Sequence, residues 1–201
     1  PTNGGGINAT DIVPTTTEYT WTVVASAFIS GASDNLVPAT SISQTLENAT
    51  NTTQQVVYTV TPISTAIGEC IGNAFTITVS VDPTPTIADT TLTVCSGVLF
   101  SYSATGDGSA GSDNVPANTT YTWTVAPNTD VLGQSADNTG LVSLDQTLIN
   151  QTNTSQLVVY TITPTSDLGC VGDDFTLTVT VDPVPLIFDT ALEICSGEAF
   201  L

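Results

Sequence analysis

Apolar and threonine side chains alternate without a break in one stretch of this chain, Phe175-Thr176-Leu177-Thr178-Val179-Thr180-Val181. Because successive side chains of a β-strand point to opposite faces, the alternation predicts a strand with one apolar face and one threonine face. An earlier copy lies 175 − 75 = 100 residues before it, in Phe75-Thr76-Ile77-Thr78-Val79-Ser80-Val81. The chain therefore holds two copies of one structural unit.

Other phrases repeat at almost the same offset. Tyr19-Thr20-Trp21-Thr22-Val23 returns as Tyr121-Thr122-Trp123-Thr124-Val125, and Val56-Val57-Tyr58-Thr59-Val60 returns as Val158-Val159-Tyr160-Thr161-Ile162. Turn signals such as 106–108 and 135–138 separate these short strands. Units of about a hundred residues built this way match the size of one β-sandwich. We therefore expect an all-β fold of tandem immunoglobulin-like sandwiches strung end to end, with helix essentially absent.

In the second unit we expect strands at 86–94, 99–104, 120–125, 142–148, 157–164 and 175–181. A Trp on the third strand is typical of the core of an immunoglobulin-like sandwich. The predicted core aromatics, one set per unit, are Trp21, Tyr58 and Phe75, with Trp123, Tyr160 and Phe175.

The offsets divide the chain unequally, into residues 1–83, 84–183 and 184–201. The first unit lacks the opening strand and half of the second strand, whereas 184–201 repeat those strands for a following unit. This last segment is too apolar to remain exposed to solvent. Either the chain is a section of a continuous array, or the segment completes a neighbouring subunit by strand donation.

The charge balance is extreme, with no Lys, Arg or His against 19 Asp and Glu, and a net charge of −19. Phosphate neutralisation needs Lys or Arg, so we expect no nucleic-acid partner, and an anionic membrane surface is disfavoured. No long apolar run predicts a membrane span. Catalysis through His or Lys is excluded, and no carboxylate pair suited to glycoside hydrolysis recurs in both units, so we expect no enzyme.

One loop, 106–114, carries Asp107 and Asp113 beside several carbonyl groups. Carboxylate and carbonyl oxygens suit Ca²⁺, which makes the two aspartates candidate metal ligands. The loop lacks the spacing of an EF-hand, and the corresponding loop of the first unit keeps one carboxylate. A solvated loop without metal is the favoured interpretation, and we expect no other cofactor.

Several phrases together resemble the PKD-like repeats of giant Bacteroidota cell-surface proteins. They are Thr-Val-Cys-Ser-Gly at 93–97, Tyr-Thr-Trp-Thr-Val at 121–125, Gln-Thr-Leu at 146–148, Val-Val-Tyr-Thr at 158–161 and Gly-Cys at 169–170. The resemblance extends from Thr17 to Phe200. It implies an extracellular, immunoglobulin-like and enzymatically inert stalk or adhesin, of the gliding-motility type and exported by type IX secretion.

In an exported protein, an even number of cysteines predicts disulfides. The four cysteines are Cys70, Cys95, Cys170 and Cys195. We favour bridges between neighbouring units, because a strand of about 20 Å separates the two ends of a sandwich. Pairing of Cys95 with Cys170, or of Cys70 with Cys95, stays open. Asp89-Thr90-Thr91 and Asp189-Thr190-Ala191 resemble a Bacteroidota O-glycosylation pattern, so Thr90 and Thr190 are candidate glycosylation sites.

We therefore expect a structural repeat segment of an extracellular adhesive or motility filament on a bacterial surface. One alternative is a ligand- or glycan-binding adhesin module. Its recognition site would lie in the loops at which the two units differ most from each other, 30–35 and 128–135. The other is a filament subunit that polymerises through 184–201. The expected partners are neighbouring repeats of the same chain or identical subunits, with surface glycans as a further candidate.

Overall fold

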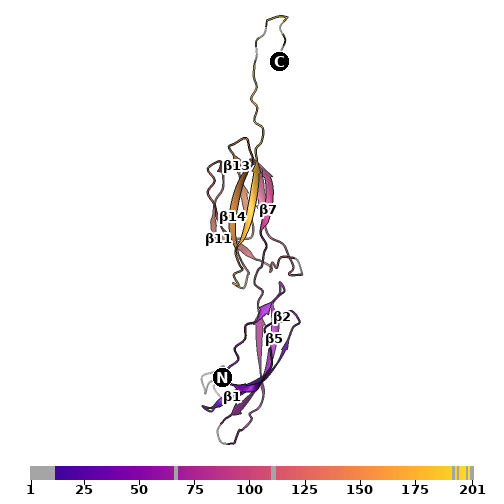
Figure 1. Ribbon diagram of the computed structural model, residues 1–201, viewed down its shortest axis with the longest axis vertical. Coiled ribbons are helices and arrows are strands. Elements are labelled where there is room, and N and C mark those ends of the chain that lie inside the picture. The colour runs from indigo at the N-terminus through magenta and orange to yellow at the C-terminus, as the bar shows by residue number, and fades with distance from the viewer. Residues whose placement is uncertain are drawn as a thin grey trace.

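The chain forms two β-sandwich repeats joined end to end, with an extended tail beyond the second (Figure 1). The computed structural model describes residues 12–65, 68–109, 112–191, 193, 195–197 and 199. Every regular element in these residues is a strand, which confirms the predicted all-β sandwich fold. Within the same residues no helix is long and apolar enough to cross a membrane.

The second repeat carries the more complete sandwich. Its strands are β7 (Thr90–Cys95), β8 (Leu99–Tyr102), β9 (Thr120–Val125), β10 (Val131–Leu132), β11 (Asp137–Leu141), β12 (Leu144–Thr147), β13 (Ile149–Asn150), β14 (Gln156–Thr165) and β15 (Phe175–Asp182). The larger sheet has the order β11-β9-β14-β15-β7. Its pairings are antiparallel except for β15 with β7, which is parallel. The strand pairs β12-β8 and β10-β13 lie outside this sheet, and β8 and β12 add Phe100 and Leu144 to the core.

The alternating stretch behaves as its pattern predicts. Its apolar side chains, Phe175, Leu177, Val179 and Val181, are at most 2% exposed, because β15 is covered on its inner face and paired on both edges. Trp123 and Tyr160 are buried in the same cluster.

The first repeat has a smaller set of strands. They are β1 (Thr17–Ala25), β2 (Ile29–Ser30), β3 (Asn35–Ala39), β4 (Glu47–Asn48), β5 (Gln54–Ser64) and β6 (Phe75–Val81). The main sheet has the order β3-β1-β5-β6, so β6 is an edge strand among the described residues. Trp21 and Tyr58 are buried in a small core, whereas Phe75 is only half-buried.

Several strand bounds differ from the sequence prediction, for example β8, which ends at Tyr102 rather than at residue 104, and three further differences follow. β7 begins at Thr90 rather than at residue 86, because the preceding residues form the junction between the repeats. The predicted turn at 135–138 is wrong in its second half, since β11 begins at Asp137 and pairs with Trp123. The single strand expected at 142–148 is β12 followed by the short β13.

The junction between the repeats is held by Asn114. Its backbone exchanges hydrogen bonds with Thr86, at 2.8 and 2.9 Å. Its side-chain amide donates to the carbonyl oxygens of Thr84 and of Thr50 in the first repeat, both at 3.1 Å. Side chain and backbone together connect the second repeat, the linker and the end of the first repeat that faces the linker.

Candidate functional site

A polar network beside the core of each repeat links three of the repeated phrases. In the second repeat, the Trp123 indole donates to the Ser135 carbonyl oxygen at 2.9 Å, and the Tyr160 hydroxyl donates to Oε1 of Gln146 at 2.6 Å. The Gln146 amide donates to the Ser135 carbonyl oxygen at 2.6 Å. Buried polar groups need such partners, so the network stabilises the repeat.

The first repeat contains the same network, through Trp21, Ser33, Gln44 and Tyr58, at 2.7–3.0 Å. The sequence prediction placed the two Trp and the two Tyr in the core but missed Ser and Gln. A signal was present, because both residues recur at an offset of 135 − 33 = 102 and 146 − 44 = 102. These repeated polar residues are structural.

The two repeats differ on one face, which we call the open face of the first repeat. It is formed by Tyr19, Phe75, Ile77 and the outer edge of β6. Ile77 is 36% exposed, whereas its counterpart Leu177 is 0% exposed. In the second repeat β7 pairs alongside β15, and residues of β7 and β8 pack on the core. No strand takes these places among the described residues of the first repeat.

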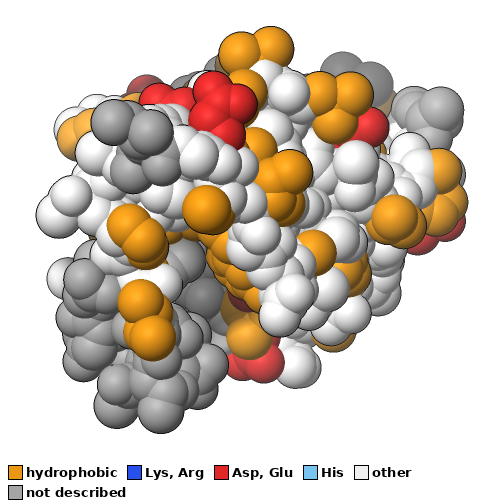
Figure 2. Space-filling model, turned by 90° about the horizontal axis from the view of Figure 1, so that it is seen from below, with side chains coloured by type: hydrophobic (Ala, Val, Ile, Leu, Met, Phe, Trp, Pro, Cys, Tyr) orange, Lys and Arg blue, Asp and Glu red, His pale blue; other side chains and the backbone are white. Residues whose placement is uncertain are grey.

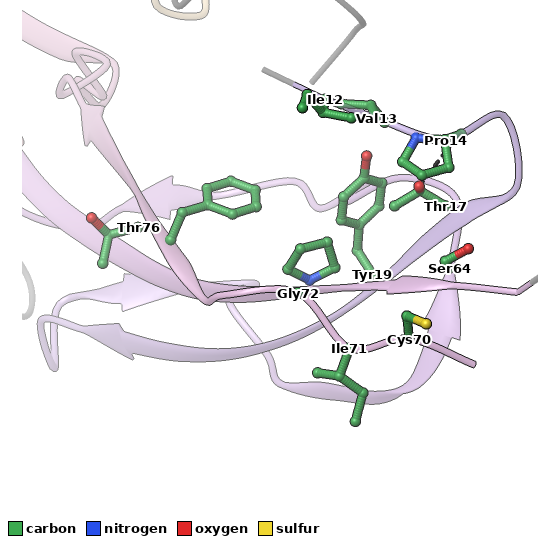
Figure 3. Close-up of a pocket in the computed structure, with 12 residues that line it drawn as sticks. Ile12, Val13, Pro14, Thr17, Tyr19, Ser64, Cys70, Ile71, Gly72 and Thr76 are labelled. Carbon is green, nitrogen blue, oxygen red and sulfur yellow. Dashed lines mark hydrogen bonds between the residues drawn. The ribbon is translucent and has the colours of Figure 1, made fainter. Parts of the chain in front are cut away.

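Two clefts of about 520 and 570 Å³ lie along the open face. In Figure 3 the ring of Tyr19 lies between Pro14 on one side and Gly72 on the other. Phe75 lines both clefts. In the second repeat Tyr102 from β8 contacts the counterpart Phe175, with ring centroids 6.2 Å apart. The clefts thus lie where the second repeat carries side chains of its opening strands.

The described part of the tail has the opposite property. Val184, Leu186, Ile187 and Phe188 are exposed, with Ile187 at 89%, and no described residue beyond Asp182 belongs to a strand. Figure 1 shows the tail leaving the end of the second repeat that lies farthest from the first repeat. The molecule therefore carries an apolar open face toward one end and an exposed apolar segment at the other.

The candidate calcium ligands accept hydrogen bonds from backbone amides. Asp107 accepts a hydrogen bond from the Ser109 amide at 3.0 Å, and this bond holds the pKa of the Asp107 carboxyl below its usual value. Asp113 accepts from the Ala88 amide at 3.0 Å. The described residues contain no group of three or more His, Cys, Asp or Glu placed to hold a metal ion. Calcium binding by Asp107 and Asp113 stays a prediction.

All four cysteines are free thiols in this structure. Cys95 pairs with Asp182 at the end of β15, whereas Cys170 precedes the start of that strand. The length of β15, eight residues or about 26 Å, therefore separates Cys95 from Cys170. Cys70 lies in the other repeat, beside Ser64 at the end of β5 remote from the linker. The favoured disulfides, of Cys95 with a cysteine of a following repeat and of Cys170 with one of a preceding repeat, stay a prediction.

The two candidate glycosylation sites have different surroundings. Thr90 is half-buried at the start of β7, opposite Leu177, whereas Thr190 is exposed in the tail. Sugar attachment at Thr90 and Thr190 stays a prediction.

The surface carries no basic side chain, and in Figure 2 acidic groups lie dispersed among hydrophobic and uncharged ones.

The fold defines the class: a tandem pair of immunoglobulin-like β-sandwiches. A family model described as PKD-like domain matches twice, at residues 6–85 and 92–185, which is most of the chain. The chain therefore belongs to the PKD-like domain family. No curated protein matches it. PKD-like domains are generally extracellular modules of a structural or adhesive type, and their fold is typically non-catalytic.

Proposed function

We propose that the chain is a structural repeat segment of an extracellular filament on a bacterial surface, with an adhesive or motility role. The observation that supports this proposal most directly is the hydrogen-bonded junction at Asn114. Its side chain and backbone join the two repeats end to end. A defined junction transmits orientation from one module to the next, as a stalk requires.

The polar groups of the repeats support the same proposal. The side-chain amides that recur in both copies are used in hydrogen bonds within each repeat, as the networks of the buried Gln146 and the half-exposed Gln44 illustrate. The motifs shared with Bacteroidota surface repeats favour gliding-type filaments and type IX export as the biological setting. A net charge of −19 opposes collapse of neighbouring filaments onto one another.

The junction gives a direct test by small-angle X-ray scattering. The purified chain is expected to have the maximum dimension of two repeats in line, and Asn114→Ala is expected to broaden the distance distribution. Thr119→Ser, which changes a side chain bonded within its own repeat, is the matched control. A compact particle, or no effect of Asn114→Ala, would contradict the stalk.

A glycan array separates the stalk from an adhesin module. We expect the chain to bind none of the glycans on the array. Specific binding that is lost when the loops at 30–35 and 128–135 are changed would contradict the stalk and favour a glycan-binding module.

A further inference from the structure

We propose that the junction between the two repeats binds one Ca²⁺ ion beside the side-chain oxygen of Asn114. Oδ1 of Asn114 and the carbonyl oxygen of Ala49 supply ligands from the two repeats, and the carboxylates of Glu47 and Asp82 line the same cleft. This site is distinct from the pair of loop aspartates described above. The inference goes beyond the proposed function, because an ion at the junction does not depend on what the filament does.

Oδ1 of Asn114 is a buried acceptor without a donor. The side chain is 9% exposed, and no hydrogen bond reaches this oxygen from the residues that the structure describes. The orientation of the amide is fixed, because its nitrogen donates to the carbonyl oxygens of Thr50 and Thr84, which can only accept. A buried acceptor in this position favours a ligand that brings positive charge or a hydrogen atom to it.

Gly108 leaves space beside this oxygen. A Cβ at Gly108 would lie 3.2 Å from Oδ1 of Asn114 and 3.0 Å from the carbonyl oxygen of Ala49. The φ of Gly108, +76°, lies in the left-handed region, which favours glycine. An oxygen of the first repeat and an oxygen of the second repeat therefore converge on one place, where a small ligand can contact both.

A cleft of about 560 Å³ opens at the same place. Asn114 and Ala49 line it together with the carboxylates of Glu47 and Asp82. The chain has no Lys, Arg or His, so no side chain of its own can balance these negative charges. A cation from the solvent is the group that can balance them.

Glu47 is particular to the junction. Its counterpart in the second repeat is Ile149, at an offset of 149 − 47 = 102, on strand β13 at the end away from the first repeat (Figure 1). The Ser30 hydroxyl donates to Oε2 of Glu47 at 3.2 Å, across the paired strands β2 and β4. The repeated position is thus apolar in the second repeat and acidic where the first repeat faces the junction.

The kind of ligand atom selects calcium. Amide, carbonyl and carboxylate oxygens are hard ligands, and Ca²⁺ accepts about six to eight of them in irregular geometry, whereas Mg²⁺ needs a near-ideal octahedron and keeps much of its water. The described residues contain no group of three or more His, Cys, Asp or Glu placed to hold a metal ion, so neutral oxygens and water must complete the shell. Such a site is weak, and we expect a Kd of about 0.1–1 mM.

The first experiment is an NMR titration of the full isotope-labelled chain with CaCl₂, after divalent ions have been removed with EDTA. The side-chain amide of Asn114 and the backbone amide of Gly108 should shift along a saturable single-site curve. MgCl₂ and NaCl at matched ionic strength control for counter-ions around a chain of charge −19. Both salts should shift these two resonances much less than CaCl₂ does.

A matched pair of variants tests the charge at the junction. Glu47→Gln keeps the size of an exposed side chain and should weaken calcium binding several-fold. Glu18→Gln removes the same charge at the opposite end of the first repeat and should leave the affinity unchanged. Gly108→Ala should abolish the saturable shift, because its Cβ would fill the space between the two oxygens. If Gly108→Ala folds poorly, the Glu47→Gln and Glu18→Gln pair still decides the outcome.

Asp107→Asn separates the junction from the neighbouring loop. The new side chain can still accept the hydrogen bond from the Ser109 amide, and the affinity should fall less than in Glu47→Gln. Loss of binding in Asp107→Asn together with unchanged binding in Glu47→Gln would assign the ion to the loop and overturn the proposal. Equal shifts with all three salts, which would indicate counter-ions only, or no shift of the Asn114 amide would overturn it as well.

These outcomes are separate from the test of the stalk. The scattering experiment on Asn114→Ala is carried out in EDTA, where the hydrogen bonds of the junction are still present. Absent calcium binding would therefore leave the stalk intact, and a compact particle in EDTA would contradict the stalk without deciding whether the NMR titration saturates.

Discussion

The side-chain amide of Gln146 meets polar groups from two other parts of its repeat. Its oxygen accepts hydrogen bonds from the Tyr160 hydroxyl and the Ser135 amide, and its nitrogen donates to the Ser135 carbonyl and hydroxyl oxygens. The residue is buried, so water cannot replace these partners. Its counterpart Gln44 makes the same set of contacts but is half-exposed.

Gln146→Ala is therefore expected to lower the free energy of unfolding of the second repeat by about 1–3 kcal/mol, because it leaves buried donors and acceptors unpaired. Gln44→Ala is the matched comparison and should cost less, since water reaches the half-exposed site. Urea unfolding followed by the fluorescence of Trp123, in a Trp21→Phe background, measures the first change. Equal losses at the two positions would contradict the role of burial.

Trp123→Ala is expected to destabilise the second repeat by about 3–5 kcal/mol, the usual effect of truncating a large buried aromatic residue. The side chain is 5% exposed and its indole nitrogen is hydrogen-bonded. Circular dichroism during thermal unfolding measures the shift. An unchanged melting temperature would show that this Trp does not belong to the core.

Buried tyrosines should make the second repeat sensitive to alkali. Burial raises the pKa of Tyr160 and Tyr121, and it raises the pKa of Tyr102 to about 12. In the unfolded chain these phenols lose their proton near pH 10. The folded state binds more protons above that pH, so the stabilisation is complete below pH 10 and is lost as the pH rises toward the folded pKa.

We therefore expect the urea midpoint of the second repeat to fall between pH 9.5 and about 12. The first repeat should respond less, because burial raises the pKa of Tyr58 there, whereas it raises the pKa of three tyrosines in the second repeat. Fluorescence of Trp123 and of Trp21, each in a variant that lacks the other Trp, reports the two repeats separately. A midpoint independent of pH would refute the assignment.

At the scale of elements, β6 and β15 have almost the same sequence and different surroundings. β15 has β14 on one edge and β7 on the other, whereas β6 pairs with β5 alone among the described strands. The apolar residues of β15 are therefore fully covered and those of β6 are not. The difference is decided by neighbours and not by the strand itself.

A matched pair of substitutions tests this difference. Leu177→Ala should lower the free energy of unfolding of the second repeat by about 2–5 kcal/mol, and Ile77→Ala should cost the first repeat clearly less, because Ile77 is partly exposed. Denaturant unfolding of each repeat measures both values, and equal costs would contradict the open face.

At the scale of the whole molecule, charge governs how copies meet. The chain carries a net charge of −19 and no basic residue, so any two copies repel one another. The tail itself includes Asp189 and Glu193. Contacts between copies in the proposed filament therefore cannot depend on attraction between opposite charges.

Salt is accordingly expected to weaken the repulsion between copies. Raising the NaCl concentration from about 10 to about 300 mM shortens the Debye length from about 30 Å to below 10 Å and should lower the second virial coefficient of the chain. Static light scattering against protein concentration measures this coefficient, and sucrose at equal osmolality serves as the control. A coefficient that rises with salt would indicate attraction between charged groups, which this composition does not provide.

The sequence by itself determined the fold class, the tandem repeat and the buried aromatics Trp21, Trp123 and Tyr160. The physical reason is that the alternation of apolar and polar residues along a strand is local and visible in the sequence. It also indicated, through the repeat offset, that 184–201 have the pattern of opening strands. Tertiary structure alone decided the roles of Ser135, Gln146 and Asn114, since each bonds groups far away along the chain. It also decided which face of the first repeat stays open, because exposure of Ile77 depends on the strands beside it and not on its own sequence.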